Sequence, residues 1–141
     1  MNSGIDLFNR LYMGDRGIQQ ILIDLVDQQV VVQVDDIDIL PDEQMEWRPG
    51  LDFPAICNAQ LVFVGCNLVT ICPQDSALDG LILNWGVEPI EREHPWPSAK
   101  YRFEFLIVGG PTAVTLRIEA DDFQLVSGEG DSAEIPFENR D

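Results

Sequence analysis

A strict alternation of apolar and polar residues constrains the fold of this chain more than any other feature. Every second residue in the ranges 101–107 and 114–118 is aromatic or aliphatic, and Gly109-Gly110-Pro111-Thr112 separates the two runs. Successive side chains of a β-strand point to opposite faces of its sheet, so this period of two is typical of strands with one buried face. The two runs and the turn residues between them therefore predict an antiparallel hairpin.

The same period recurs along most of the chain. Residues 21–34 predict a second hairpin that turns at residues 27–29, and the acidic run 35–38 together with Pro41 is expected to close its second strand. Further strands are predicted at residues 61–64, 68–72, 81–85 and 123–126. Between the first two of these, Gly65-Cys66-Asn67 predicts either a tight hairpin or a bulge in one long strand.

The remaining segments predict one helix and two long loops. An S-x-x-D start signal at residues 3–6 and apolar residues at helical spacing predict a short helix, which Gly14-Asp15-Arg16-Gly17 is expected to end. Asp15 and Arg16 are expected to have structural roles that join this helix to the sheet. Residues 41–58 and 86–99 contain most of the prolines and are expected to be loops.

These elements favour a mainly β fold. About seven or eight short strands with frequent turn signals are typical of an antiparallel sandwich or a half-open barrel, here with a short N-terminal helix. No helical stretch separates the strands, so parallel βαβ units are not expected. Residues 1–126 are expected to form a single β-rich domain, and residues 127–141 an acidic C-terminal tail.

The charge balance limits the classes of partner. The chain has 25 acidic and 8 basic residues, which gives a formal net charge of −17. A strongly acidic surface repels phosphates and anionic lipids, so nucleic acids and membrane surfaces are disfavoured as partners, whereas a basic protein is allowed. Hydrophobic residues make up 45% of the sequence, enough for a folded core despite this charge.

Cysteine usage and the N-terminal sequence bear on the cellular compartment. Cys57, Cys66 and Cys72 are odd in number, lack zinc or CxxC spacing and have apolar neighbours, so buried thiols are expected. The N-terminus has neither the charged nor the apolar region of a signal peptide. No apolar run approaches the roughly 18 residues that a membrane helix needs. These observations predict a cytoplasmic protein.

The sequence offers few residues for catalysis or for metal binding. His94 is the only histidine, and it is expected to pack in a loop or lie on the surface. The acidic residues in 35–46 lack the order of an EF-hand, so a solvated acidic loop is favoured over a calcium site. No GxGxxG, P-loop or HExxH motif is present. We therefore expect no enzyme activity, cofactor or resident metal. A divalent-metal module or small hydrolase that uses the 35–46 loop remains an alternative.

The tryptophans suggest where a partner protein would bind. Trp85 ends a predicted strand and is expected in the core, whereas Trp47 and Trp96 lie in the predicted loops beside acidic residues. An aromatic anchor ringed by carboxylates suits a basic partner, because the ring supplies buried area and the charges steer encounter. The alternative is that both rings close the end of the β fold. The predicted partner-binding residues are Asp35, Asp36, Asp38, Asp42, Glu43, Glu46, Trp47, Glu91, Glu93 and Trp96.

The sequence Leu11-Tyr12-Met13-Gly14-Asp15-Arg16 also carries a family resemblance. It resembles an uncharacterised family of small bacterial proteins that share a Leu-Tyr-(Leu or Met)-Gly-Asp-Arg element. Further matches are the strands at 21–24, 32–35, 61–63 and 116–120, the loop residue Trp47, and Phe123 near the end. The likeness spans most of residues 7–126 and departs in the proline-rich stretch 88–99. It implies an acidic, non-catalytic protein that accompanies a bacterial toxin as an immunity factor, and it brings no catalytic residues.

Resemblance and charge together lead to one expectation and two alternatives. The chain is expected to be an immunity-type inhibitor that covers a basic toxin or nuclease surface, with an oligomeric state that the sequence leaves open. A phage-encoded inhibitor that mimics DNA would share this mechanism. In the second alternative, the acidity serves solubility alone.

Overall fold

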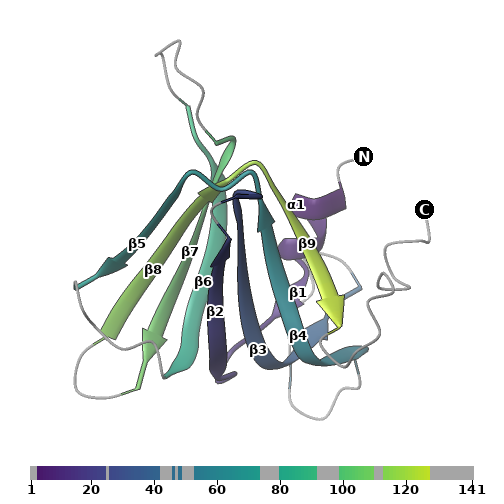
Figure 1. Cartoon of the computed structure of the whole chain (residues 1–141). Coiled ribbons are helices and arrows are strands. Elements are labelled where there is room, and N and C mark those ends of the chain that lie inside the picture. Colours follow the sequence, from purple (N-terminus) through teal and green to yellow (C-terminus); the bar gives the residue numbers. More distant parts are fainter. Residues whose placement is uncertain are drawn as a thin grey trace.

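The computed structural model describes residues 3–24, 26–41, 46, 48, 53–73, 80–91, 99–109 and 113–127. Within these residues the chain forms one helix and nine strands (Figure 1). They are α1 (Ser3–Phe8), β1 (Leu11–Tyr12), β2 (Ile18–Asp24), β3 (Gln29–Ile39), β4 (Ala55–Val64), β5 (Leu68–Cys72), β6 (Leu81–Pro89), β7 (Tyr101–Val108), β8 (Ala113–Ala120) and β9 (Asp122–Ser127). The mainly β fold class is confirmed, with nine strands where about seven or eight were expected.

The strands form two antiparallel sheets. In sheet A, β1 and β2 both pair with one edge of β3, and β4 and β9 follow on the other side. In sheet B the order is β5-β8-β7-β6. Each sheet thus contains one strand, β9 or β5, that comes from the opposite half of the chain. Figure 1 shows the strands as one curved, half-open array in which β6 of sheet B lies beside β2 of sheet A.

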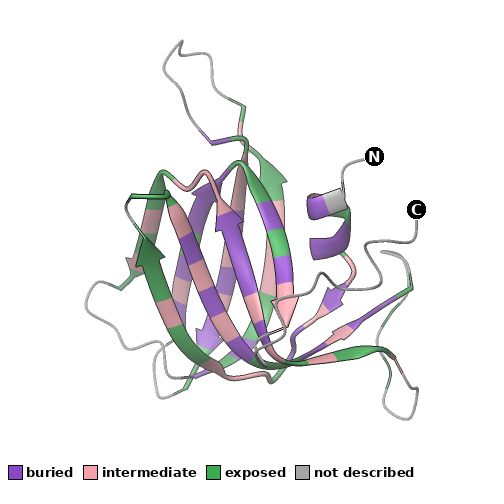
Figure 2. Ribbon diagram, turned by 45° about the vertical axis from the view of Figure 1, so that its right-hand side comes forward, coloured by how far each residue is buried: buried purple, intermediate pink, exposed green. Residues whose placement is uncertain are grey.

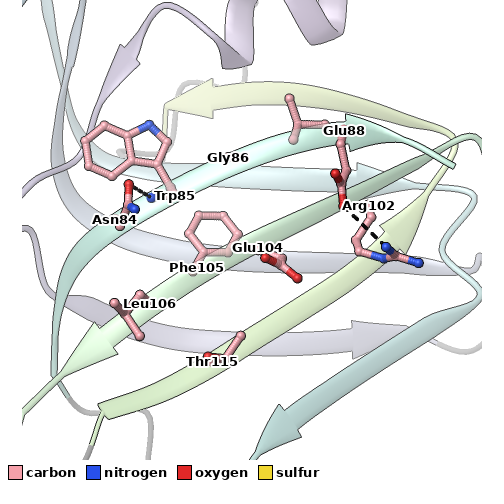
Figure 3. A pocket seen from close by; sticks show the side chains of 10 residues that line it. Asn84, Trp85, Gly86, Glu88, Arg102, Glu104, Phe105, Leu106 and Thr115 are labelled. Carbon is pink, nitrogen blue, oxygen red and sulfur yellow. Dashed lines mark hydrogen bonds and ion pairs between the residues drawn. The ribbon is translucent and has the colours of Figure 1, made fainter.

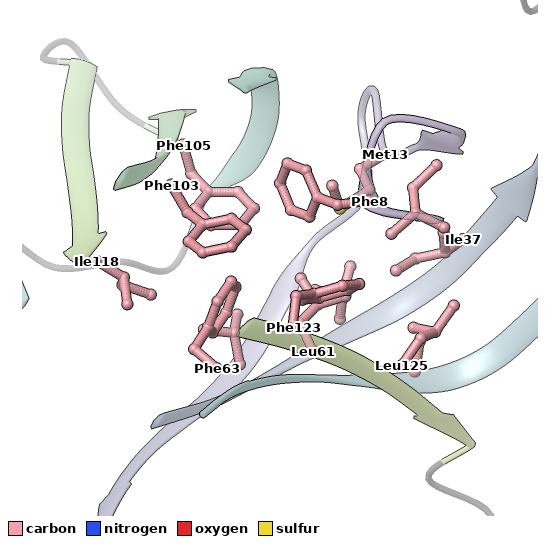
Figure 4. Packing of buried hydrophobic residues seen from close by; sticks show 14 of the residues in the cluster. Phe8, Met13, Ile37, Leu61, Phe63, Phe103, Phe105, Ile118, Phe123 and Leu125 are labelled. Atoms are coloured by element: carbon pink, nitrogen blue, oxygen red, sulfur yellow. The ribbon is translucent and has the colours of Figure 1, made fainter. Parts of the chain in front are cut away.

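The core lies between the concave faces of the two sheets and is rich in phenylalanine. Phe63 and Phe123 of sheet A face Phe103 and Phe105 of sheet B, and all four rings are buried (Figure 4). Phe8 of α1 is fully buried among them, with its ring centroid 5.1 Å from those of Phe103 and Phe123. The short helix therefore belongs to the core of the fold.

The predicted alternation is confirmed where it was strongest. β7 and β8 form the expected hairpin, which pairs Phe105 with Leu116 and Phe103 with Ile118, and all four side chains are buried. β2 and β3 form the second expected hairpin. Figure 2 shows the resulting pattern, in which buried and more exposed residues alternate along the strands. The last predicted strand is present as β9.

Neither prediction for Gly65-Cys66-Asn67 was right. These residues carry the chain from β4 in sheet A to β5 in sheet B. The Cys66 N–H donates to the Gln28 carbonyl at 2.8 Å, and the Asn67 N–H donates to the Glu119 carbonyl at 3.0 Å. The reason is that β4 already pairs with β3 and β9 on its two edges, so β5 cannot pair with it. Gly65 has a φ of +68°, which glycine adopts at little cost.

The acidic run 35–38 does not end the strand, because β3 continues through it to Ile39, two residues before Pro41. Pairing with sheet neighbours on both edges supports this length, with β1 and β2 on one side and β4 on the other. The buried positions change from Val34 to Ile37, so Asp35 and Asp36 are both exposed where the alternation shifts. Strands also extend into both predicted loops, since β4 begins at Ala55 and β6 continues to Pro89.

Three smaller expectations are also corrected. The helix ends at Phe8 rather than at Gly14, because Leu11 is buried and pairs with Ile39 as β1. Trp85 lies in the middle of β6 and is only partly buried. The cysteines are not buried thiols: Cys57 and Cys72 are exposed, and Cys66 is intermediate. In the described residues, no helix has the length and apolar character needed to cross a bilayer.

Candidate protein-binding surface

Asp15 and Arg16 lie in a segment, residues 13–18, that connects the two sheets; we call it the seam. The Asp15 N–H donates to the Ile82 carbonyl, and the Ile82 N–H donates to the Arg16 carbonyl, both at 2.8 Å, which attaches the seam to β6. The Asp35 N–H donates to the Gly17 carbonyl at 3.0 Å, which attaches it to β3. The Arg16 side chain also reaches β3, where Nη2 lies 3.3 Å from Oδ2 of Asp38. The seam thus bonds sheet B to sheet A.

Tyr12 and Gly14 of the Leu-Tyr-Met-Gly-Asp-Arg sequence lie beside this ion pair, whereas Leu11 and Met13 are buried in the hydrophobic core. The Tyr12 ring packs edge-on against Trp85 with centroids 5.4 Å apart, and the Arg16 guanidinium lies 5.8 Å from the Tyr12 ring centroid. At Gly14, a Cβ would collide with the Tyr12 hydroxyl. Tyr12, Gly14 and Arg16 of this sequence therefore have structural roles in specific contacts.

The three predicted aspartates of β3 are brought together on one strand but differ in their contacts. Asp38 is half-buried and pairs with Arg16. Asp35 is exposed, and its carboxylate accepts hydrogen bonds from the Gly17 N–H at 3.1 Å and from Gln19 Nε2 at 2.7 Å. Those two donors are neutral, so Asp35 keeps an uncompensated charge. Asp36 is also exposed, and it forms no ion pair with Lys or Arg among the described residues.

The other predicted partner-binding residues are only partly described. Glu46 and Glu91 are exposed. Asp42, Glu43, Trp47, Glu93 and Trp96 lie outside the described residues, as does His94. Within the part of the chain that the structure describes, no three His, Cys, Asp or Glu side chains are placed to hold a metal ion.

A network of ion pairs on the convex face of sheet B was not predicted. Arg102 on β7 lies 3.3 Å from Glu88 on β6 and 3.2 Å from Glu119 on β8. Arg117 on β8 contacts Glu104 on β7 at 2.6 Å. The hydrogen bond to Glu119 raises the pKa of Arg102 above its ordinary value. The sequence contained a signal for these ion pairs, because the predicted hairpin places Arg102 opposite Glu119 and Glu104 opposite Arg117, and opposite charges at facing positions attract.

An open groove lies on the same sheet, where Gly86 has no side chain. Its volume is about 450 Å³, and it is bordered by Trp85, Glu88, Arg102 and Glu104 among others (Figure 3). A Cβ at Gly86 would meet no atom within 4 Å. Arg102 already contacts Glu88, and Arg117 already contacts Glu104, so the charges at this groove are largely compensated.

Comparison with known families matches residues 1–135 to a family of unknown function, DUF6258. The chain belongs to this family. The expected membership in an uncharacterised family is confirmed, whereas the bacterial origin and the immunity-type role stay predictions. Neither the curated proteins nor the solved structures give a match.

The uncompensated acidic residues of this DUF6258 member have a defined distribution. Among the described residues, eight exposed aspartates form no ion pair with Lys or Arg, in contrast to the paired glutamates of sheet B. They are Asp6, Asp15, Asp24, Asp27, Asp35, Asp36, Asp121 and Asp122. Asp6 lies in α1 and Asp15 in the seam, whereas the other six lie in strands of sheet A or in turns directly attached to them. Most of the unpaired aspartates therefore lie on or beside sheet A, whereas the three glutamates in the strands of sheet B are all paired with arginines.

Proposed function

We propose that this protein is a non-catalytic acidic binding protein of the immunity type, which covers a basic surface of a toxin or nuclease. The observation that carries the proposal is the separation of charge between the sheets. The three glutamates in the strands of sheet B are all paired with two arginines of the same chain, whereas the exposed aspartates on and around sheet A form no ion pair with Lys or Arg among the described residues.

Electrostatics explains why such a surface suits a basic partner. Uncompensated carboxylates create a potential that attracts Lys- and Arg-rich surfaces and speeds their association. A nuclease needs a basic surface to bind phosphates, and an acidic protein can occupy the same surface. The chain need supply no catalytic group for this function, because covering the groove is sufficient.

The test is a titration against the native partner. The tagged chain is used to capture its partner from cells of the source organism, and the purified pair is titrated calorimetrically at low and high salt. We expect a basic partner, 1:1 stoichiometry and an affinity that falls by about tenfold or more between 50 and 300 mM NaCl. An acidic partner, or an affinity that does not change with salt, would refute the proposal.

Two matched double variants sharpen this test. D35N/D36N removes two uncompensated charges from β3, whereas E88Q/E104Q removes two charges that pair with arginines on sheet B. Each changes the net charge by the same amount. We expect the first pair to weaken binding by about tenfold and the second to change it little. Equal effects would show that only the total charge matters.

A further inference from the structure

The convex face of sheet A has an unusual composition for so acidic a chain. The strand register places two rows of side chains across β2, β3, β4 and β9 on this face, and only Val62 at its centre is buried, at 8% exposed. None of the eight residues is charged, although the chain has 25 acidic residues. The rows are Leu22, Val31, Val62 and Gln124, and Gln20, Gln33, Gln60 and Val126, which together we call the amide face.

Acidic residues border the amide face. Asp24 and Asp122 lie at the two ends of the next row, since Asp24 pairs with Gln29, Gln29 with Val64, and Val64 with Asp122. Asp35 lies beyond the opposite row, two residues after Gln33 on the same strand. The result is an uncharged centre with an acidic rim.

Protein interfaces have this arrangement. Charged residues are depleted from the centre of an interface, and the rim is polar and accessible to water. Glutamine amides both donate and accept hydrogen bonds, so they can bond to a partner without burying a charge. Neighbouring strands lie about 4.8 Å apart, so the four strands give a centre about 15 Å wide, which is the scale of the inner part of a standard interface.

We infer that the amide face is the docking surface for the basic partner, an inference that rests on the proposed function and specifies its site. The partner contributes an uncharged patch to the centre and Lys or Arg side chains opposite Asp24, Asp35 and Asp122. A second copy of this chain is a poor occupant, because its own acidic rim would face the same aspartates and repel them.

The first experiment locates the attractive surface without knowledge of the partner. An octa-arginine peptide that carries a nitroxide spin label is added to the isotope-labelled protein at low salt, and the loss of amide NMR signal is mapped. We expect the strongest loss on the amide face and its rim, and little on the convex face of sheet B. Loss centred on sheet B, or confined to residues outside sheet A, would overturn the docking site.

The second experiment places a positive charge in the interface with the captured partner. Gln124→Arg on β9 and Thr70→Arg on β5 are matched, since both residues are exposed, both strands are sheet edges, and both variants change the net charge equally. We expect Gln124→Arg to weaken binding by at least about 30-fold and Thr70→Arg by less than about threefold.

A further variant and the possible outcomes keep the two proposals distinct. Gln20→Arg, at the opposite edge of the amide face, is expected to act like Gln124→Arg, so a local effect on β9 would be recognised. If a basic, salt-sensitive partner binds but Thr70→Arg is the damaging change, the docking site is wrong and the proposed function stands. If the captured partner is acidic or insensitive to salt, the function is wrong, and the docking inference is withdrawn with it.

Discussion

The ion pair between Arg16 and Asp38 allows a direct test of the seam. Asp38→Asn keeps the size and the shape of the side chain and removes only the charge that faces the guanidinium. We expect this change to destabilise the fold, because Arg16 would retain its position near Tyr12 without a counter-ion. The Nε of Arg16 is already buried without a hydrogen-bond partner, and Nη1 donates only a long hydrogen bond, of 3.4 Å, to the Gly14 carbonyl.

The magnitude follows from the distance and burial of the pair. Two unit charges 3.3 Å apart attract by about 5 kcal/mol at an effective dielectric constant of about 20, before desolvation is subtracted. The Arg16 and Asp38 side chains are 25% and 17% exposed. Breaking a fully buried pair costs about 3–5 kcal/mol, and an exposed pair about 0–1 kcal/mol. The expected loss is therefore about 2 kcal/mol, or roughly 6 °C in Tm.

Asp36→Asn is the matched control, because Asp36 is exposed on the same strand and the net charge changes equally. Urea unfolding followed by tryptophan fluorescence and circular dichroism measures both variants, and we expect Asp36→Asn to change the free energy of unfolding by less than about 0.5 kcal/mol. A double-mutant cycle with Arg16→Met should show a coupling of about 1 kcal/mol. If Asp38→Asn and Asp36→Asn have the same effect, the ion pair does not hold the sheets together.

Three other predictions concern the core and the connections. Phe8→Ala should lower the free energy of unfolding, measured with urea, by about 3–5 kcal/mol. The control Asp6→Ala, on the exposed side of α1, should lower it by less than about 0.5 kcal/mol. An equally small loss for Phe8→Ala would mean that α1 is not part of the core. Gly65→Ala should cost about 1–2 kcal/mol because of its positive φ, whereas Gly86→Ala within β6 should be neutral or stabilising. Calorimetric melting that ranks the two variants in the opposite order would contradict the geometry described at both glycines. Burial raises the pKa of the Cys66 thiol, so less of it is thiolate at pH 8 and it should react more slowly with a disulfide reagent than Cys57 and Cys72 do. Cys66→Ser should remove this slow phase. Equal reaction rates for all three thiols would contradict the prediction.

Local patterns predicted those parts of the fold in which pairing follows the chain. The β7–β8 hairpin was predictable because its alternation and its turn residues agree, and adjacent strands simply pair with each other. The connection at Gly65 could not be predicted in this way, because its turn residues are compatible with a next strand in the same sheet or in the other sheet. Only the distant pairing of β4 with β9 decides between them.

The candidate site shows the same division. That Asp35 and Asp36 belong together and carry charge could be read from the sequence. Their place within a central strand could not, because an acidic run usually ends a strand unless neighbours on both sides support it. The amide face was missed for a related reason: Gln33 and Gln60 become neighbours only through the register of β3 with β4.

The exchange of β5 and β9 between the sheets makes the two halves of the chain mutually dependent. Residues up to β5 build most of sheet A but contribute one edge strand to sheet B, and the residues from β6 onward build most of sheet B but contribute the last strand of sheet A. This is donor-strand complementation within a single polypeptide. A backbone cut between Pro73 and Gly80 would therefore produce two fragments with open sheet edges, neither of which folds alone, and which reassemble as a 1:1 heterodimer when mixed.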